Sequence, residues 1–348
     1  MRPPFANTTL LLLAEHWPEH LAQATGSPAW LAQAERATAH TAMALRNFAN
    51  SGPLVAQTNF LAHLLVLPLP GPVAVAAPAG EEEYIVIGQQ FIDLLRFHAQ
   101  ASACLQVAEF LLRSGAPISD ALAQARPLAL WCALEWMHDW FKSGGAVPSL
   151  RPLVRSPLAL GMESDVLMQG LLFLVLHECG HFALGHATVG PNDHGVATFE
   201  QMSSDVLSPM KRQELAADAW AVRAQRWINP AWQTMAVCRL FLMFGIAHAA
   251  LSVHPKEHPY VHDRCAHLIA ALQSEQVQVT PEMVHLPRFV AEEYALRERR
   301  LVRSNAPSAQ EHLSVLQSFL AMTSQAFESA GSDAAHFGVS LTAPRSCP

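Results

Sequence analysis

The 348-residue sequence predicts a mainly α-helical protein with a small β-hairpin or short edge sheet. Apolar residues recur at helical spacing over long stretches, whereas strand-forming residues concentrate in one place. The sequence contains no internal repeat and no heptad run. Hydrophobic residues make up 51% and charged residues 15%, which is typical of a globular chain with a sizeable core.

The N-terminal region, residues 1–150, is expected to be mainly helical around one short β segment. Helices are predicted where apolar residues recur three and four apart, over residues 28–50, 90–113 and 119–142. The β signal lies near residues 72–88, where the runs Pro72–Ala77 and Tyr84–Ile87 flank a turn rich in Pro, Gly and acidic residues.

A Pro-rich segment around residues 147–157 predicts a joint before a second domain over residues 151–300. Residues 301–348 are expected to form a C-terminal helix and a loose tail.

The sequence predicts two helix starts in the second domain. Ser164 is a predicted N-cap for a helix over residues 165–185. Ser208 is a predicted cap for a helix over residues 209–228, with Pro at its first position. The polar, Gly-containing segment 187–206 between them is expected to be a loop.

Charge and cysteine usage exclude some classes of function. The formal net charge is −7, and the one short basic stretch, residues 297–303, gives no footprint for nucleic acid. The six cysteines are scattered and form no CxxC pair, which predicts reduced thiols and a cytoplasmic protein.

Two apolar stretches invite comparison with membrane spans. Residues 166–176 are too few to cross a bilayer, and residues 234–253 carry Arg239 and His248. We therefore expect buried core helices and no stable membrane span.

The strongest chemical motif is His-Glu-Cys-Gly-His at residues 177–181. Histidines four apart project from one face of a helix, so His177 and His181 can reach one metal ion. Glu178 then lies where a base can take a proton from a zinc-bound water. The helix is apolar before this motif, and buried His and Glu are costly without a metal or hydrogen bonds. The alternative is a chance match, because the chain has 18 histidines.

A second motif, Glu-Leu-Ala-Ala-Asp at residues 214–218, supplies what a catalytic metal still needs. Three protein ligands and one open position are typical of catalytic zinc, and Glu214 can be the third ligand. Asp218 shares its helix face and can accept the free ring N–H of a ligand histidine. The small residues Ala216 and Ala217 allow close packing against the first helix. The alternative is a solvated acidic helix face.

His177-Glu178-x-x-His181 followed by Glu214-x-x-Ala217-Asp218 resembles the gluzincin pattern of the CAAX-prenyl endopeptidase superfamily. It is also similar to the phage-exclusion protease Lit and its relatives. The resemblance covers about residues 165–273 and implies a zincin-type helical core, with His177, His181 and Glu214 as zinc ligands and Glu178 as catalytic base. The β segment followed by a helix is similar to the strand that lies upstream of the zinc helix in these families, where an edge strand commonly pairs with extended substrate.

A third match is His258-Pro259 followed by Arg264, similar to the HP-x4-R segment of the prenyl-endopeptidase group. The resemblance implies that His258 stabilises the oxyanion and that Arg264 braces an acidic residue, for which Asp218 is the candidate. His254-Pro255 competes for the same role, with a poorer spacing. The alternative is a Pro-rich turn, 254–259, before a helix predicted from about residue 260 to residue 272.

Two residues near the motif receive structural interpretations. His186 is nine residues past His177, which places it on the opposite face of a continuous helix, so we do not expect it to be a ligand. Cys179 points away from the histidines and is expected to be a packed thiol.

The sequence therefore predicts a zinc-dependent endopeptidase that hydrolyses peptide bonds in protein or peptide substrates. A second hypothesis is a regulatory or binding protein that retains a zinc site without proteolysis, although such a site needs no Glu178. A third is a membrane-embedded prenyl-peptide protease, which the missing spans disfavour. The pattern names neither the substrate nor the oligomeric state.

Overall fold

The computed structural model describes residues 5–49, 60–71, 73–100, 157–186, 196–197, 209–225, 254–255, 261–274 and 318. Helices make up 78% of these residues, beside a small three-stranded sheet, so the predicted mainly α class with a short sheet is confirmed. The predicted helix over residues 119–142 lies outside the described residues, as do the predicted C-terminal helix and tail over residues 301–348 apart from residue 318.

The chain divides into two compact units. The first unit comprises Met1–Asp93 and Met168–Glu298, and the second comprises Leu94–Leu167 and Arg299–Pro348. The β segment and the predicted metal ligands His177, His181 and Glu214 belong to the first unit, although the sequence places the β segment and the ligands in different domains. The predicted boundaries near residues 150 and 300 stay predictions.

Three helices open the first unit. They are α1 (Phe5–His16), α2 (Pro18–Gly26) and α3 (Pro28–Ala49). Proline begins α2 and α3, in the first helical turn where its missing N–H costs nothing. Helix α3 matches the predicted helix, but α1 and α2 were not predicted, because each is short.

The sheet contains β1 (Leu64–Leu67), β2 (Ala74–Ala79) and β3 (Glu82–Gly88) in the order β1-β3-β2. Strands β2 and β3 form the expected antiparallel hairpin, and Gly80 at its turn has a positive φ of 65°. Strand β1 pairs parallel with β3 and was not predicted. A strand that pairs in parallel is not joined to its partner by a hairpin turn, so the sequence has no local signal for the pairing.

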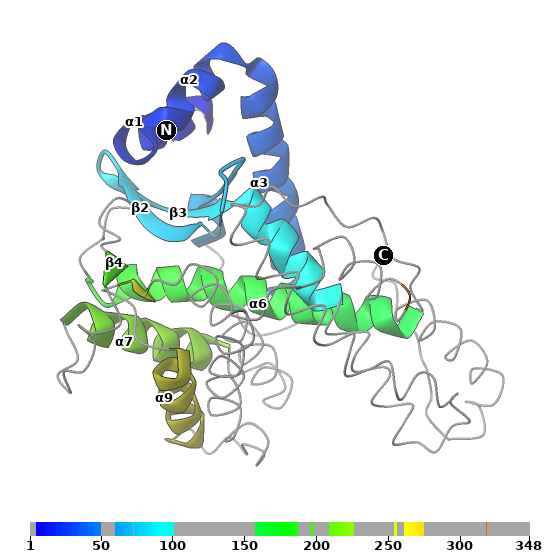
Figure 1. Ribbon diagram of the computed structural model, residues 1–348, viewed down its shortest axis with the longest axis vertical. Coiled ribbons are helices and arrows are strands. Elements are labelled where there is room, and N and C mark those ends of the chain that lie inside the picture. The colour runs from blue at the N-terminus through cyan, green and yellow to red at the C-terminus, as the bar shows by residue number, and fades with distance from the viewer. Residues whose placement is uncertain are drawn as a thin grey trace, which may run out of the picture. The chain divides into compact units, whose positions relative to one another are not determined.

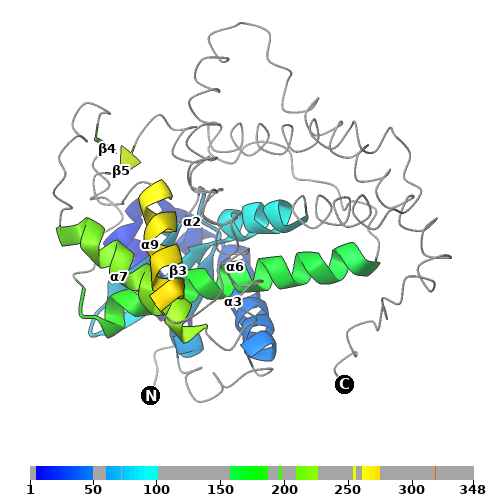
Figure 2. The ribbon, with the colours of Figure 1, turned by 90° about the horizontal axis from the view of Figure 1, so that it is seen from below.

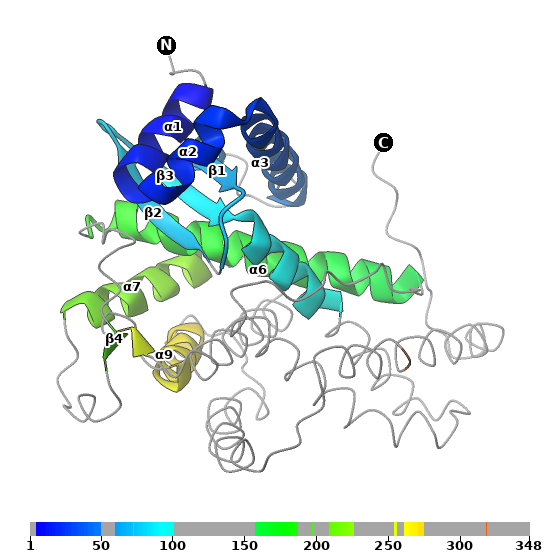
Figure 3. The ribbon, with the colours of Figure 1, turned by 45° about the horizontal axis from the view of Figure 1, so that its top comes forward.

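Alternate residues of the strands are buried on opposite faces of the sheet. One face packs with α1, α2 and α3 in an apolar cluster: Leu12, Leu13, Trp17, Ala24, Ala34, Leu65, Leu67, Ala77, Ala79, Tyr84 and Val86. The opposite face is also buried, through Leu64, Val66, Ile85 and Ile87. Figures 1 and 3 show the N-terminal helices over the first face and helix α6 along the second.

Side chains from the N-terminal helices occupy backbone groups at both edges of the sheet. Thr38 of α3 accepts a hydrogen bond from the Val66 N–H of β1 through Oγ1, at 2.8 Å. His16 of α1 donates from Nε2 to the Pro78 carbonyl of β2, also at 2.8 Å. Each edge therefore has at least one backbone position that is already paired.

Three helices carry the metal motifs: α6 (Pro157–Ala183), α7 (Pro209–Ala224) and α9 (Val261–Ser274). Helix α7 lies beside α6 and contacts α9 (Figure 2). The predicted starts of α7 and α9 agree with the structure to within a residue or so. The predicted start of α6 was wrong, because the helix begins at Pro157 and Ser164 lies inside it.

Helix α6 is apolar enough to raise the question of a membrane span. Among the described residues, Val166–Ala183 passes by length and composition, although 72% of this segment is buried within the protein. The core helix of a soluble protein passes the same test, so this finding does not decide between the two.

The second unit contains the chain from Leu94 and the beginning of α6. Residues 89–100 are helical, and Leu94, Leu95 and Phe97 are buried. Gln100 donates from Nε2 to Glu163 Oε1 at 3.2 Å, which satisfies two buried polar groups within this unit.

Candidate metal centre

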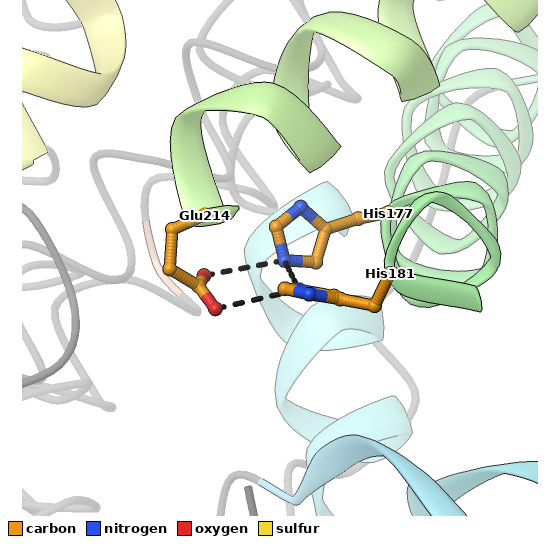
Figure 4. A group of neighbouring side chains, drawn as sticks. All are labelled: His177, His181 and Glu214. Atoms are coloured by element: carbon orange, nitrogen blue, oxygen red, sulfur yellow. Dashed lines mark hydrogen bonds and ion pairs between the residues drawn. The ribbon is translucent and has the colours of Figure 1, made fainter. Parts of the chain in front are cut away.

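Three side chains predicted as ligands converge on one point. His177 and His181 lie one turn apart on α6, and their Nε2 atoms are 3.2 Å apart. Glu214 projects from α7, with Oε2 3.3 Å from His177 Nε2 and Oε1 3.3 Å from His181 Nε2. Figure 4 shows the carboxylate facing both imidazoles across the gap between the helices.

These separations fit the ligand spacing around a tetrahedral metal. Ligand atoms about 2.0–2.2 Å from an ion, at tetrahedral angles, lie about 3.3–3.5 Å from one another. The observed separations are of this size, with Oε2 of Glu214 facing His177 and Oε1 facing His181, and the three side chains leave one tetrahedral position to an outside ligand. His177, His181 and Glu214 could hold a metal ion.

The ring of His177 is oriented by a second carboxylate. Asp218 lies one turn after Glu214 on α7, and its Oδ1 is 2.9 Å from His177 Nδ1. This is the position predicted for Asp218. With Nδ1 facing an anion, the proton belongs on Nδ1 and the lone pair of Nε2 is directed at the metal position.

Arg264 of α9 holds Asp218 in turn. Its Nε and Nη2 donate to the two oxygens of Asp218 at 2.8 and 2.7 Å, and Nη1 lies 4.0 Å from Glu214 Oε2. The predicted contact between Arg264 and Asp218 is thus present. Burial by itself raises the pKa of Asp218, but the charges of Arg264 and His177 outweigh it and leave the pKa below its usual value.

The electrostatic surroundings favour positive charge at His177. Burial lowers the pKa of this imidazole, but the Asp218 and Glu214 carboxylates raise it more, to about 10. The buried Asp218 and the partly buried Glu214 carboxylates therefore favour a cation at this position, either a proton or a metal ion.

Glu178 faces the sheet. It is buried, and this burial raises the pKa of its carboxyl group, while the nearby His177 and His181 lower it. The nearby backbone N–H of Ala76 also favours the charged carboxylate and lowers its pKa.

The register of β2 explains why Ala76 is available to Glu178. The Val73 carbonyl accepts from the Gly88 N–H at 2.8 Å, so alternate residues starting at Val73 bond to β3. The backbone groups of Ala74, Ala76 and Pro78 consequently point away from β3. The sequence did not predict the role of Ala76, because a backbone donor has no side-chain signature.

Close contact between α6 and α7 brings the ligands together. A Cβ atom placed on Gly180 would lie 3.2 Å from both the Cα and the carbonyl oxygen of Ala217. Only glycine fits without moving one helix. This agrees with the expectation that Ala217 permits tight packing.

The predicted position of His186, on the opposite face of a continuous helix, was wrong, whereas the expectation that it is not a metal ligand stays a prediction. Helix α6 ends at Ala183, and Gly185 adopts a positive φ of 64°, so the chain turns back instead of continuing along the helix. His186 Nδ1 lies 3.1 Å from His181 Nδ1. Partial burial lowers the pKa of His186, and His181 lowers it further. Gly185, four residues after His181, was the sequence signal that could have predicted this turn of the chain.

Three further predictions concern Cys179, His258 and His254–Pro255. Cys179 is buried as expected, and burial raises the pKa of its thiol to about 12. His258 lies outside the described residues. His254–Pro255 forms a short strand, β5, paired with β4 (Val196–Ala197), where a turn and a loop were expected.

No protein-family model, curated protein or solved structure matches this chain.

Proposed function

We propose that the protein is a zinc-dependent endopeptidase that hydrolyses peptide bonds in protein substrates. The observation that carries the proposal is the close grouping of His177, His181 and Glu214 as potential metal ligands, with the buried Glu178 carboxylate next to them in the sequence. A site that only holds a metal for stability is normally closed by four protein ligands and needs no neighbouring base.

The ligand set favours zinc. Two histidines and one glutamate with an open fourth position are the ligands of catalytic zinc in one large group of peptidases. Zinc in such a site lowers the pKa of water and polarises a carbonyl group.

Glu178 is the proposed general base. Its carboxylate takes the proton of the attacking water and passes it to the leaving amine. The raised pKa that follows from burial helps both transfers, because such a carboxyl group binds and releases a proton nearer neutral pH. The nearby Ala76 N–H favours the charged form of this carboxylate.

Strand β2 supports a peptide as the substrate class. Among the described residues no strand pairs with its outward side, where the backbone groups of Ala74 and the carbonyl of Ala76 are directed. An extended peptide can add to such an edge by main-chain hydrogen bonds. His16 already donates a hydrogen bond to the Pro78 carbonyl, which limits pairing with a peptide to the first part of β2.

The other roles keep their predicted assignments as part of the proposal. His258 donates to the oxyanion, and Arg264 braces Asp218. The protein acts in the cytoplasm on protein or peptide substrates, without nucleic acid and without a stable membrane span.

Metal analysis of three purified proteins tests the proposal: the wild type, Glu178→Gln and His177→Ala. We expect about one zinc per chain in the first two proteins and loss of zinc in the third. Proteomic comparison of new protein N-termini should then find cleavage products with the wild type that are missing with Glu178→Gln. Zinc without any cleavage would favour a regulatory protein, and a wild type that takes up no zinc would end the enzyme hypothesis.

A further inference from the structure

A third histidine lies against the ligand pair at the end of α6. The rings of His181 and His186 have centroids 5.1 Å apart and planes inclined by 70°, and their Nδ1 atoms are 3.1 Å apart. This is the distance of a direct N–H···N hydrogen bond. His181 thus has a partner on the ring nitrogen that faces away from Glu214.

The backbone fixes this contact. The Gly185 N–H donates to the Phe182 carbonyl at 3.1 Å, and the His186 N–H donates to the His181 carbonyl at 2.9 Å. These two bonds, with a left-handed glycine between them, form a Schellman motif. In this motif the residue after the glycine lies over the residue two positions before the last helical residue, Ala183, and this residue is His181.

The direction of the hydrogen bond follows from the metal site. His181 can offer a lone pair at Nε2 only if its proton is on Nδ1. That Nδ1–H must then donate, and His186 Nδ1 must accept and leave its own proton on Nε2.

We infer that His186 is a positioning residue, which accepts the Nδ1–H of His181 and holds that ring with Nε2 toward the metal. The inference rests on the metal site of the proposed function. His186 does for His181 what Asp218 does for His177, so each ligand imidazole is held at its second nitrogen.

Two substitutions separate hydrogen bonding from shape. In His186→Asn, an amide oxygen stands at the δ position that Nδ1 occupies, and it can accept the same hydrogen bond. In His186→Leu, an apolar carbon stands there. His40→Leu, at an exposed histidine of α3, controls for loss of a surface imidazole. Zinc dissociation constants are measured for all four proteins by competition with a chromophoric chelator.

We expect His186→Leu to weaken zinc binding about 10–100-fold, while His186→Asn and His40→Leu stay close to the wild type. Circular dichroism of the metal-free proteins should give the same unfolding temperature for the Leu and Asn variants. Wild-type affinity in His186→Leu overturns the inference, as do equal losses in the Leu and Asn variants. Failure of the wild type to bind zinc overturns the proposed function itself, which is a different outcome.

Discussion

At the scale of single residues, the site is a set of charges removed from water. Asp218 is 0% exposed and Arg264 is 6% exposed, and they are joined by two hydrogen bonds. A buried charge whose partner is removed has lost both its water and its counterion. The charges near the metal position are therefore held in place by one another.

Replacing Arg264 by Met should destabilise the protein strongly. Asp218 would stay buried without its guanidinium, which costs about 3–5 kcal/mol. Urea denaturation of the metal-free protein measures the loss. Arg46→Met, at an exposed arginine of α3, is the control and should change stability by less than about 0.5 kcal/mol. Equal effects of the two substitutions would contradict the buried ion pair.

Zinc affinity should rise with pH through the neutral range. The pKa of His177 is raised to about 10, so its imidazole carries a proton at pH 7 before metal binds. A metal ligand must be deprotonated, so binding releases this proton, and affinity increases about tenfold per pH unit below pH 10. Titration calorimetry in two buffers of different ionisation enthalpy counts the protons released. Binding without proton release would disprove this account of His177.

At the scale of helices and strands, the site depends on how closely α6 meets two neighbours. Gly180 brings α7 close enough for Glu214 to reach both histidines, and the backbone N–H of Ala76 in β2 favours the charged form of Glu178. Helix α6 thus presents its metal ligands to one element and its base to another.

The glycines of α6 allow a matched test of the first contact. Gly180→Ala places a methyl group against the Ala217 backbone and should cost about 1–3 kcal/mol, with weaker zinc binding as α7 moves away. Gly170→Ala has no atom within 4 Å of its new Cβ and should stabilise the helix by about 0.5–1 kcal/mol. Denaturation and zinc titration of both variants measure these effects. A Gly180→Ala protein that is stabilised like Gly170→Ala, with unchanged zinc affinity, would refute the close contact.

The substitution Ala76→Pro should impair catalysis without disrupting the sheet. The Ala76 N–H points away from β3, and Pro78 already occupies an equivalent outward position. Losing this donor raises the pKa of Glu178, so the acidic limb of the pH–rate profile moves to higher pH. We expect kcat/KM at neutral pH to fall about 10–100-fold, the worth of a hydrogen bond to a charged group. Ala74→Pro, which leaves the Glu178 contact intact, is the control for the fold, and an Ala76→Pro protein with an unshifted profile would argue against the contact.

At the scale of the whole molecule, metal and fold are linked. The three ligands come from two helices of the first unit, so an ion joins segments that are far apart in the sequence. A ligand that binds only the folded chain stabilises it in proportion to the logarithm of its concentration.

Removal of metal should therefore lower the unfolding temperature. Free zinc at one hundred times its dissociation constant contributes about 2.7 kcal/mol. Calorimetry with and without a chelator measures the shift, and His181→Ala should show none. If the unfolding temperature of the wild type changes with neither zinc nor chelator, the three side chains do not bind the ion in the folded state.

The sequence predicted what depends on local periodicity and missed what depends on distant backbone. The spacing of His177 and His181, and of Glu214 and Asp218, follows from the helical repeat alone, so these residues could be placed before the structure. Strand β1, the Ala76 donor and the Gly180 contact depend on elements far apart in the chain. His186 was misjudged because the end of a helix, unlike its interior, is decided by one glycine.

The contact between Thr38 and Val66 has a consequence for self-association. Exposed strand edges recruit strands from other molecules and so begin domain swapping or fibril growth. The Thr38 hydroxyl occupies the Val66 amide in the middle of β1, so a second copy of the chain meets no continuous row of donors there. This hydrogen bond therefore disfavours the addition of a strand from another copy of the chain at the β1 edge of the sheet.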